Sequence, residues 1–191
     1  LRAAFERWLS ANHAKVEELW IRIYKKDSGT RTITAVEAID VGLCWGWIDG
    51  IRKSYDDVSF LQRYTPRRAK SVWSQVNRDN VARLVREGRM TPHGMAHVEA
   101  AKADGRWDAA YAPIRSASSD AIPEDLRAAI RANAKAERTF QRLNKMNLFA
   151  LAYRVGAMRT PAGRARKIES LVAMLAKGET ITPLPKAAKK K

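Results

Sequence analysis

The sequence predicts an α+β protein, in which a small antiparallel sheet is packed by helices and followed by a C-terminal helical region. Three observations support this class: β-forming runs lie between residues 18 and 64, helical periodicity flanks them, and helical patterns alone follow residue 120. The chain has 191 residues and a hydrophobic fraction of 46%. That is enough for one sizeable domain, or for a main domain with a helical appendage.

Each element of the first third follows from a local pattern. Phe5, Trp8 and Leu9 recur at helical spacing, which predicts an amphipathic helix. Thr34 followed by Glu37 matches a capping box, which predicts a helix start. Runs rich in β-branched and aromatic residues predict strands. The expected elements are a helix over 2–12, a strand over 18–25, a helix over 34–44, and a hairpin with strands over 47–53 and 58–64.

Helices are expected from Ser71 onward. One runs from Ser71 to a glycine stop near residue 88, and Thr91 with Pro92 opens the next, over 91–104. Three further helical stretches are expected over 123–133, 139–153 (one helix or two) and 160–178. The predicted organisation is an α+β domain over 1–113, a small and polar linker over 114–120, a basic helical region over 121–178, and a flexible lysine-rich tail over 179–191.

The positive charge is concentrated toward the C-terminus. The net charge of +16 divides into 0 for residues 1–60, +5 for 61–120 and +11 for 121–191. Such a basic C-terminal half predicts salt-sensitive attraction to a polyanion, with nucleic acid as the leading candidate partner. The competing interpretation is that the charge only keeps the protein soluble.

Cysteine content and hydropathy indicate a cytoplasmic protein. Cys44 is the single cysteine, which excludes an intrachain disulfide and fits a reducing compartment. Charged residues interrupt every apolar run before about twenty residues, so no membrane span is expected. The opening residues 1–20 contain acidic side chains and no apolar core, so we expect no secretory signal there.

The segment from Trp45 to Trp73 is the predicted functional centre, because tryptophans, tyrosines and charged residues are dense in it. Its rings either form a binding platform or anchor the core. Asp49, Arg52 and Lys53 are expected to converge on one face, or else Asp49 caps a turn or forms an ion pair. The candidate ligand-binding residues are Trp45, Trp47, Asp49, Arg52, Lys53, Thr65, Arg67, Arg68, Ser71, Trp73 and Asn77.

A second pattern in this segment suggests anion binding. Arg67, Arg68 and Lys70 precede the helix expected to start at Ser71, so their charges would adjoin a helix N-terminus that favours anions. A small anionic ligand would suit this arrangement. A structural arginine cluster paired to nearby aspartates is the competing account.

Known catalytic and cofactor signatures are missing from the sequence. His93 and His97 lie four residues apart, but no HExxH motif surrounds them, so exposed helix histidines are expected and no metal site is predicted. Cys44 lies near a helix C-terminus, which disfavours a thiolate nucleophile. The glycines at 42, 46 and 50 follow a helix, so they do not form a dinucleotide fingerprint, and no cofactor is expected.

Two sequence boxes carry a resemblance to a known family. They are GWIDG at 46–50 and TPRRAKSVWS at 65–74, followed by a helix with asparagine, valine and leucine over 77–84. Together with the arginine-rich helix over 160–178, they resemble the bacterial YdeI/OmpD-associated, or bacteriocin-protection, family. The stretch 141–158 departs from that family's pattern by being more apolar and more basic. The resemblance implies a role in stress or antimicrobial tolerance and implies no catalytic residue.

Three functional hypotheses follow. The first is a non-enzymatic protein that binds an anionic ligand or polyanion. The second is an enzyme that uses Asp49 as acid or base and Arg67 as an anion clamp in the same pocket. The third is an envelope-associated scaffold that binds a protein partner.

Overall fold

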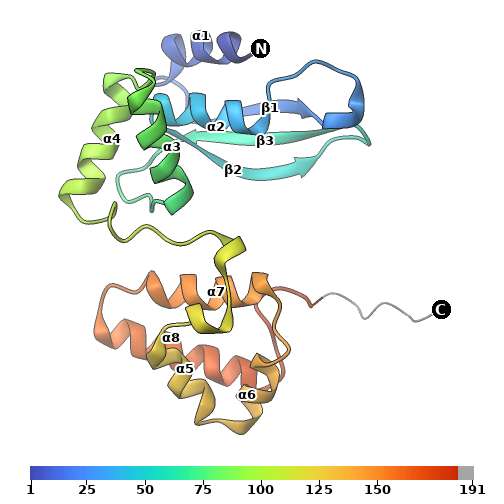
Figure 1. The fold of residues 1–191 in the computed structure, drawn as a ribbon, viewed down its shortest axis with the longest axis vertical. Coiled ribbons are helices and arrows are strands. Elements are labelled where there is room, and N and C mark those ends of the chain that lie inside the picture. Colours follow the sequence, from blue (N-terminus) through green and yellow to red (C-terminus); the bar gives the residue numbers. More distant parts are fainter. Residues whose placement is uncertain (185–191) are drawn as a thin grey trace. The chain divides into compact units, whose positions relative to one another are not determined.

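The computed structural model describes residues 1–184 and forms two units, an N-terminal unit (Leu1–Ala110) and a C-terminal unit (Tyr111–Lys191) (Figure 1). The predicted α+β class is confirmed: the sheet lies in the first unit, and the second is helical in its described part. Residues 185–191, the end of the predicted tail, lie outside the described residues.

The N-terminal unit follows the predicted element order. The capping box is present, because the Thr34 side chain accepts from the Glu37 amide while the Glu37 side chain accepts from the Thr34 amide. The elements are α1 (Arg2–Asn12), β1 (Leu19–Tyr24), η1 (Lys26–Ser28), α2 (Ala35–Cys44), β2 (Trp47–Ser54), β3 (Ser59–Pro66), α3 (Gln75–Arg86) and α4 (Pro92–Ala103).

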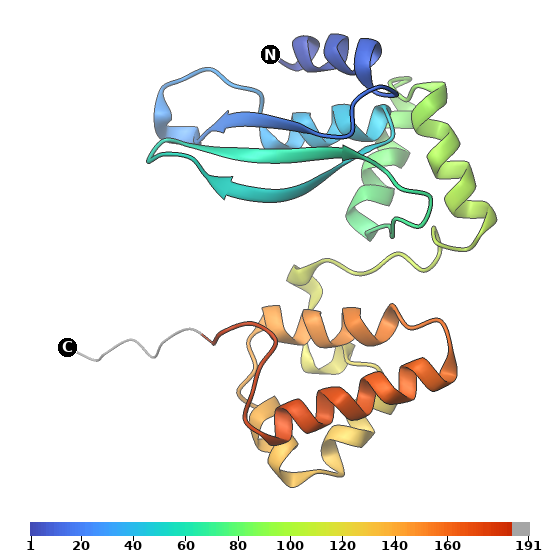
Figure 2. The same ribbon diagram turned by 180° about the vertical axis from the view of Figure 1, so that it is seen from behind.

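The three strands within residues 1–110 form an antiparallel sheet in the order β1-β3-β2. Its inner face packs against α1 and α2, where Phe5, Val41, Trp47 and Tyr64 meet in one buried cluster. Figure 2 shows the opposite, outer face, which no helix of this fully described unit covers. Side chains therefore alternate along each strand between the face toward the helices and the outer face.

One predicted helix start is wrong. The helix expected from Ser71 begins at Gln75, and the side chain of Ser74 caps it by accepting from the Asn77 amide at 3.1 Å. The residues before it form a turn over 68–71, closed by a hydrogen bond from the Ser71 amide to the Arg68 carbonyl, and then place Trp73 in the core, with 2% of its surface exposed. Arg67, Arg68 and Lys70 consequently do not adjoin a helix N-terminus.

The C-terminal unit has a core of its own, built on apolar side chains that recur at helical spacing. The stretch 139–153, expected as one helix or two, contains the end of one helix and most of the next, with Asn144 capping the second. The stretch 114–120, expected as a linker, contains one short 3₁₀ helix and most of a second. The elements are η2 (Ile114–Ser116), η3 (Ser119–Ala121), α5 (Glu124–Arg131), α6 (Ala134–Phe140), α7 (Lys145–Gly156) and α8 (Pro161–Ala176).

The residues after α8 are fixed to α7 by one buried amide. Asn147, which exposes 1% of its surface, donates to the Thr182 carbonyl at 3.0 Å and accepts from the Thr182 amide at 2.9 Å. Both backbone groups of Thr182 are thereby satisfied. The first residues of the predicted tail thus pack on the helical unit.

Helix α4 docks on the end of α2 through a glycine. A Cβ built on Gly94 would lie 2.7 Å from the Cys44 carbonyl carbon and closer still to its oxygen. Thr91, which caps α4, also donates to that oxygen from its hydroxyl at 2.6 Å. Because both partners at Gly94 are backbone, the contact cannot relax by a side-chain rotation.

We therefore predict that Gly94→Ala lowers the free energy of unfolding by about 3 kcal/mol, since α4 must move away from α2. Urea unfolding followed by tryptophan fluorescence measures the change. Gly156→Ala is the control, because nothing lies within 4 Å of a Cβ there; it should cost nothing and gain up to about 1 kcal/mol from helix propensity. Equal stability of Gly94→Ala and the native chain would contradict this docking.

Candidate functional site

The two sequence boxes meet at the turn that ends α2. Gly46 has a φ of +69°, which lets the chain leave the helix and enter β2 directly. The Gly46 carbonyl accepts from the Arg67 amide at 2.8 Å, and the Cys44 carbonyl accepts from the Thr91 amide at 3.2 Å. The chain after β3 and the start of α4 are therefore tied to the same turn.

The candidate residues around this turn differ widely in burial. Trp47 is fully buried, and its indole donates to the His13 carbonyl at 3.2 Å. The Trp73 ring contacts the Arg67 guanidinium, which lies 3.6 Å from its centroid, and the Trp107 ring, whose centroid lies 4.9 Å away in an edge-on arrangement. These two tryptophans are core residues. Of the other candidates, Arg67 is buried, Trp45, Asp49, Thr65, Ser71 and Asn77 are half-buried, and Arg52, Lys53 and Arg68 are exposed.

The side chain of Arg67 is a buried cation beside the turn. Its guanidinium donates to the Val72 carbonyl at 3.1 Å, and the residue exposes 5% of its surface. Burial raises the pKa of the Asp49 carboxyl, and the charge of Arg67 acts against that rise. The arrangement holds a buried cation near a poorly solvated acid, with the arginine committed to stacking on Trp73.

The expected convergence of Asp49, Arg52 and Lys53 holds for only two of the three. A register shift between Asp49 and Arg52 places both on the inner face, where Asp49 pairs with Tyr64 and Arg52 with Gln62. Arg52 donates to the Gln62 side chain at 3.0 Å. Lys53 lies on the outer face instead, because side chains alternate again after the shift. The prediction that Lys53 shares a face with Asp49 was wrong.

The three histidines of the chain form a cluster that the sequence did not predict. The ring centroids of His13 and His93 are 4.4 Å apart, those of His93 and His97 are 5.2 Å apart, and His13 lies 4.9 Å from Trp45. A Cβ on Gly46 would lie 2.9 Å from His97 Nε2. The helix histidines expected to be exposed are thus packed against the turn. The four-residue spacing of His93 and His97 was the one local signal.

The histidine cluster is electrostatically disfavoured when protonated. Burial lowers the pKa of both His93 and His97; the charge of His13 adds to the effect at His93, and the charges of His93 and Arg67 add to it at His97. Burial also raises the pKa of the Cys44 thiol to about 11. Across residues 1–184, no group of three or more His, Cys, Asp or Glu side chains is arranged to hold a metal ion.

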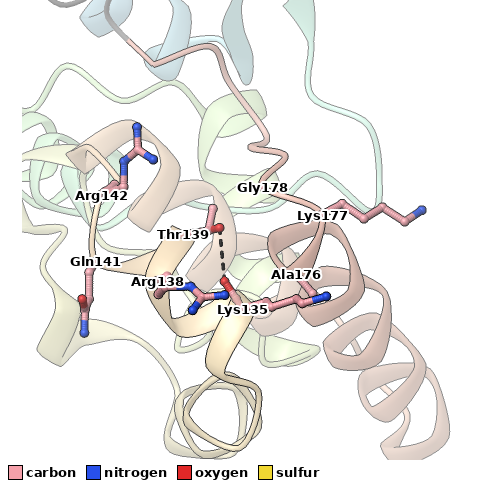
Figure 3. A pocket seen from close by; sticks show the side chains of 8 residues that line it. All are labelled: Lys135, Arg138, Thr139, Gln141, Arg142, Ala176, Lys177 and Gly178. Carbon is pink, nitrogen blue, oxygen red and sulfur yellow. Dashed lines mark hydrogen bonds between the residues drawn. The ribbon is translucent and has the colours of Figure 1, made fainter.

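The C-terminal unit contains a separate candidate site, a hollow of about 550 Å³ between α6 and the end of α8 (Figure 3). We call it the basic hollow. Its lining includes four cationic side chains and no Asp or Glu. The lining residues are Lys135, Arg138, Thr139, Gln141, Arg142, Ala176, Lys177 and Gly178.

Comparison with known proteins gives two matches to family models. Residues 121–178 match the family described as "Bacteriocin-protection, YdeI or OmpD-Associated", and residues 1–97 match a domain of unknown function, DUF8412. The DUF8412 match spans more than half of the chain. The chain belongs to the DUF8412 family and carries a YdeI/OmpD-associated domain. A search of curated proteins and a search of solved structures each gave no match.

The YdeI/OmpD-associated resemblance is confirmed for residues 121–178, which include the basic hollow. The GWIDG and TPRR boxes lie within the DUF8412 match instead. The turn and its histidine cluster therefore belong to the DUF8412 domain. Among residues 1–184, no helix is both long and apolar enough to cross a membrane.

The histidine cluster predicts acid-sensitive stability. An unfolded histidine has a pKa near 6.5, so the unfolded chain binds protons that folded His93 and His97 resist. Their contribution to stability is complete above pH 6.5 and is lost as the pH falls through their lowered pKa values. Urea unfolding at about pH 7.5 and about pH 5.5 should show a fall that is smaller in His97→Gln. An equal fall in both proteins would contradict this account.

Asp49 offers a second test, of structure against catalysis. Because burial raises the pKa of its carboxyl, the charged form is less favourable in the folded chain than in the unfolded chain. We predict that Asp49→Asn folds and resists urea at least as well as the native chain, whereas the exposed Asp57→Asn changes little. A less stable Asp49→Asn would show that the charge is needed for folding. Loss of a turnover found by metabolite screening, with the fold intact, would favour an enzyme.

Proposed function

We propose that this protein is a non-enzymatic polyanion-binding protein, in which the basic hollow holds phosphate groups of a nucleic acid. The observation that carries the proposal is the hollow's lining, which includes four cations and no carboxylate. Arginine and lysine side chains bind phosphate oxygens through charge-assisted hydrogen bonds.

The spacing of the cations on α6 supports this proposal. Lys135 and Arg138 are three residues apart on one helix face, Arg142 follows in the turn after the helix, and all three line the hollow. Lys177, which ends α8, adds a fourth charge from the neighbouring helix. Figure 3 shows these side chains around the hollow, with the Thr139 hydroxyl bonded to the Lys135 carbonyl.

The acid on the same helix does not neutralise these cations. Glu137 forms a two-point ion pair with Arg127 of α5, one bond of which measures 2.7 Å. That pair lowers the pKa of the Glu137 carboxyl. The Glu137 carboxylate and the Arg127 guanidinium thus pair with each other and join α5 to α6. Because Glu137 is already paired, it does not cancel the positive charge of the basic hollow.

The surrounding charge favours an extended polyanion over a small anion. The described residues of the C-terminal unit, 111–184, carry thirteen Lys and Arg against six Asp and Glu. A nucleic acid engages such a surface at many phosphates and releases counterions, whereas a single small anion engages one site. Because residues 121–178 match a family described as bacteriocin-protection, the proposal also includes a role in bacteriocin tolerance.

We predict that Lys135→Glu combined with Arg138→Glu weakens binding of a fluorescein-labelled oligonucleotide at least tenfold, because two attractive interactions with phosphates become repulsive. Fluorescence anisotropy at several salt concentrations measures this. The slope of log K against log salt concentration should become shallower by about 1 for each phosphate that the variant no longer binds.

The matched control is Arg159→Glu combined with Arg166→Glu. It makes the same change in net charge at exposed residues that do not line the hollow. If the two double variants lose affinity equally, only total charge matters and the hollow is not a site. If the native protein binds no oligonucleotide at low salt, the proposed function is wrong.

A further inference from the structure

The outer face of the sheet carries aromatic and cationic side chains in alternate rows. Register places Trp20 beside Arg63 in one row, and Arg22, Leu61 and Lys53 in the next. The third row holds Tyr24 and Ser59, with Tyr55 bonded through its amide to the Ser59 carbonyl at 3.3 Å. Rows on one face are about 6.8 Å apart, since successive side chains of a strand alternate between faces.

Rings and cations on the outer face are in direct contact. The Arg22 guanidinium lies 4.6 Å from the Tyr24 centroid and 4.5 Å from the Tyr55 centroid. The Lys53 ammonium lies 4.8 Å from the Trp20 centroid. All three distances are within the range of cation–π contacts.

These side chains are all at least partly exposed to solvent. Tyr55 exposes 57% of its surface, which is high for an aromatic residue, and Trp20 and Tyr24 are half-buried. No helix of the N-terminal unit, all of which the structure describes, covers this face (Figure 2). The inner-face aromatics Trp47 and Tyr64, by contrast, expose none of their surface.

We infer that the outer face is a platform for single-stranded nucleic acid, whose bases stack on Trp20, Tyr24 and Tyr55 while its phosphates contact Arg22, Lys53 and Arg63. An open sheet face with rings and cations suits a single strand, because unpaired bases expose π-faces that a duplex buries. The inference rests on the proposed function for its class of ligand. It adds a second surface, on the other unit, and a preference for single strands.

Two carboxylates lie beside this face and do not block it. Asp56 pairs with Arg22 at 2.6 Å, and Glu18 pairs with Arg63 at 2.6 Å. Side chains in both pairs are about one-third to one-half exposed. Exposed pairs contribute little to stability, so a phosphate can replace either carboxylate as the partner of the guanidinium. Within the described residues, Lys53 has no carboxylate at ion-pair distance.

The test compares a labelled single-stranded oligonucleotide with the duplex made from it, by anisotropy on the full chain. The expected result is that the native protein prefers the single strand, and that Trp20→Ala and Tyr55→Ala each weaken single-strand binding about tenfold without changing duplex binding. Trp20→Phe, which keeps a ring, should retain most of the affinity. Val36→Ala, at an exposed apolar residue of α2, is the control and should change neither.

The variants also separate this inference from the proposed function. Tyr55 lies after the end of β2 and is largely exposed, so Tyr55→Ala tests the platform even if Trp20→Ala fails to fold. Native affinity in Tyr55→Ala and in a folded Trp20→Ala overturns the platform, whatever the basic-hollow variant does. If these variants lose single-strand binding while Lys135→Glu with Arg138→Glu keeps it, the outer face is a binding surface and the basic hollow is not. A native protein that prefers duplex, or binds neither, overturns the platform.

Discussion

The backbone turn from Cys44 to Gly46 is the constraint on which the N-terminal unit depends. The Cys44 carbonyl accepts from both the amide and the hydroxyl of Thr91, and the Gly46 carbonyl accepts from the Arg67 amide. The start of α4 and the exit from β3 are therefore fixed to the end of α2 by three hydrogen bonds. Gly46 and Gly94 permit this closeness, since a Cβ at either would collide with neighbouring atoms. The histidine cluster, the Arg67–Trp73 stack and the sheet edge all take their positions from this one turn.

Local signals predicted most of the fold, and non-local contacts decided the rest. The Thr34–Glu37 capping box and the helix start at Pro92 depend on contacts within four residues, so they can be predicted from the sequence. The start of α3 was not predicted correctly, because Ser71 and Ser74 can both cap a helix. The structure uses Ser74, which leaves Trp73 before the helix and in the core. The register shift after Asp49 likewise depends on pairing with β3. His13 and His93 are eighty residues apart, and only tertiary packing brings their rings together.

The density of aromatic residues in the 45–73 segment was a poor guide to where a ligand could bind. Trp47, Tyr64 and Trp73 are buried, so much of that density serves the core. The exposed aromatic surface is instead set by strand parity: Trp20 and Tyr24 lie outside the segment, and Tyr55 lies at the tip of its hairpin. Which face a ring occupies matters more for binding than how many rings a segment contains.

The two proposed surfaces would respond differently to salt, which has a consequence for how the protein selects its ligand. Attraction by the basic hollow is electrostatic and weakens as salt is added, since the Debye length is about 8 Å at physiological ionic strength. Stacking on the outer face involves ring and base contacts that screening affects much less. Charge on the outer face is also partly balanced by Asp56 and Glu18. Raising the salt therefore removes more of the sequence-independent attraction than of the stacking, so the preference for single strands over duplex should grow while the total affinity falls.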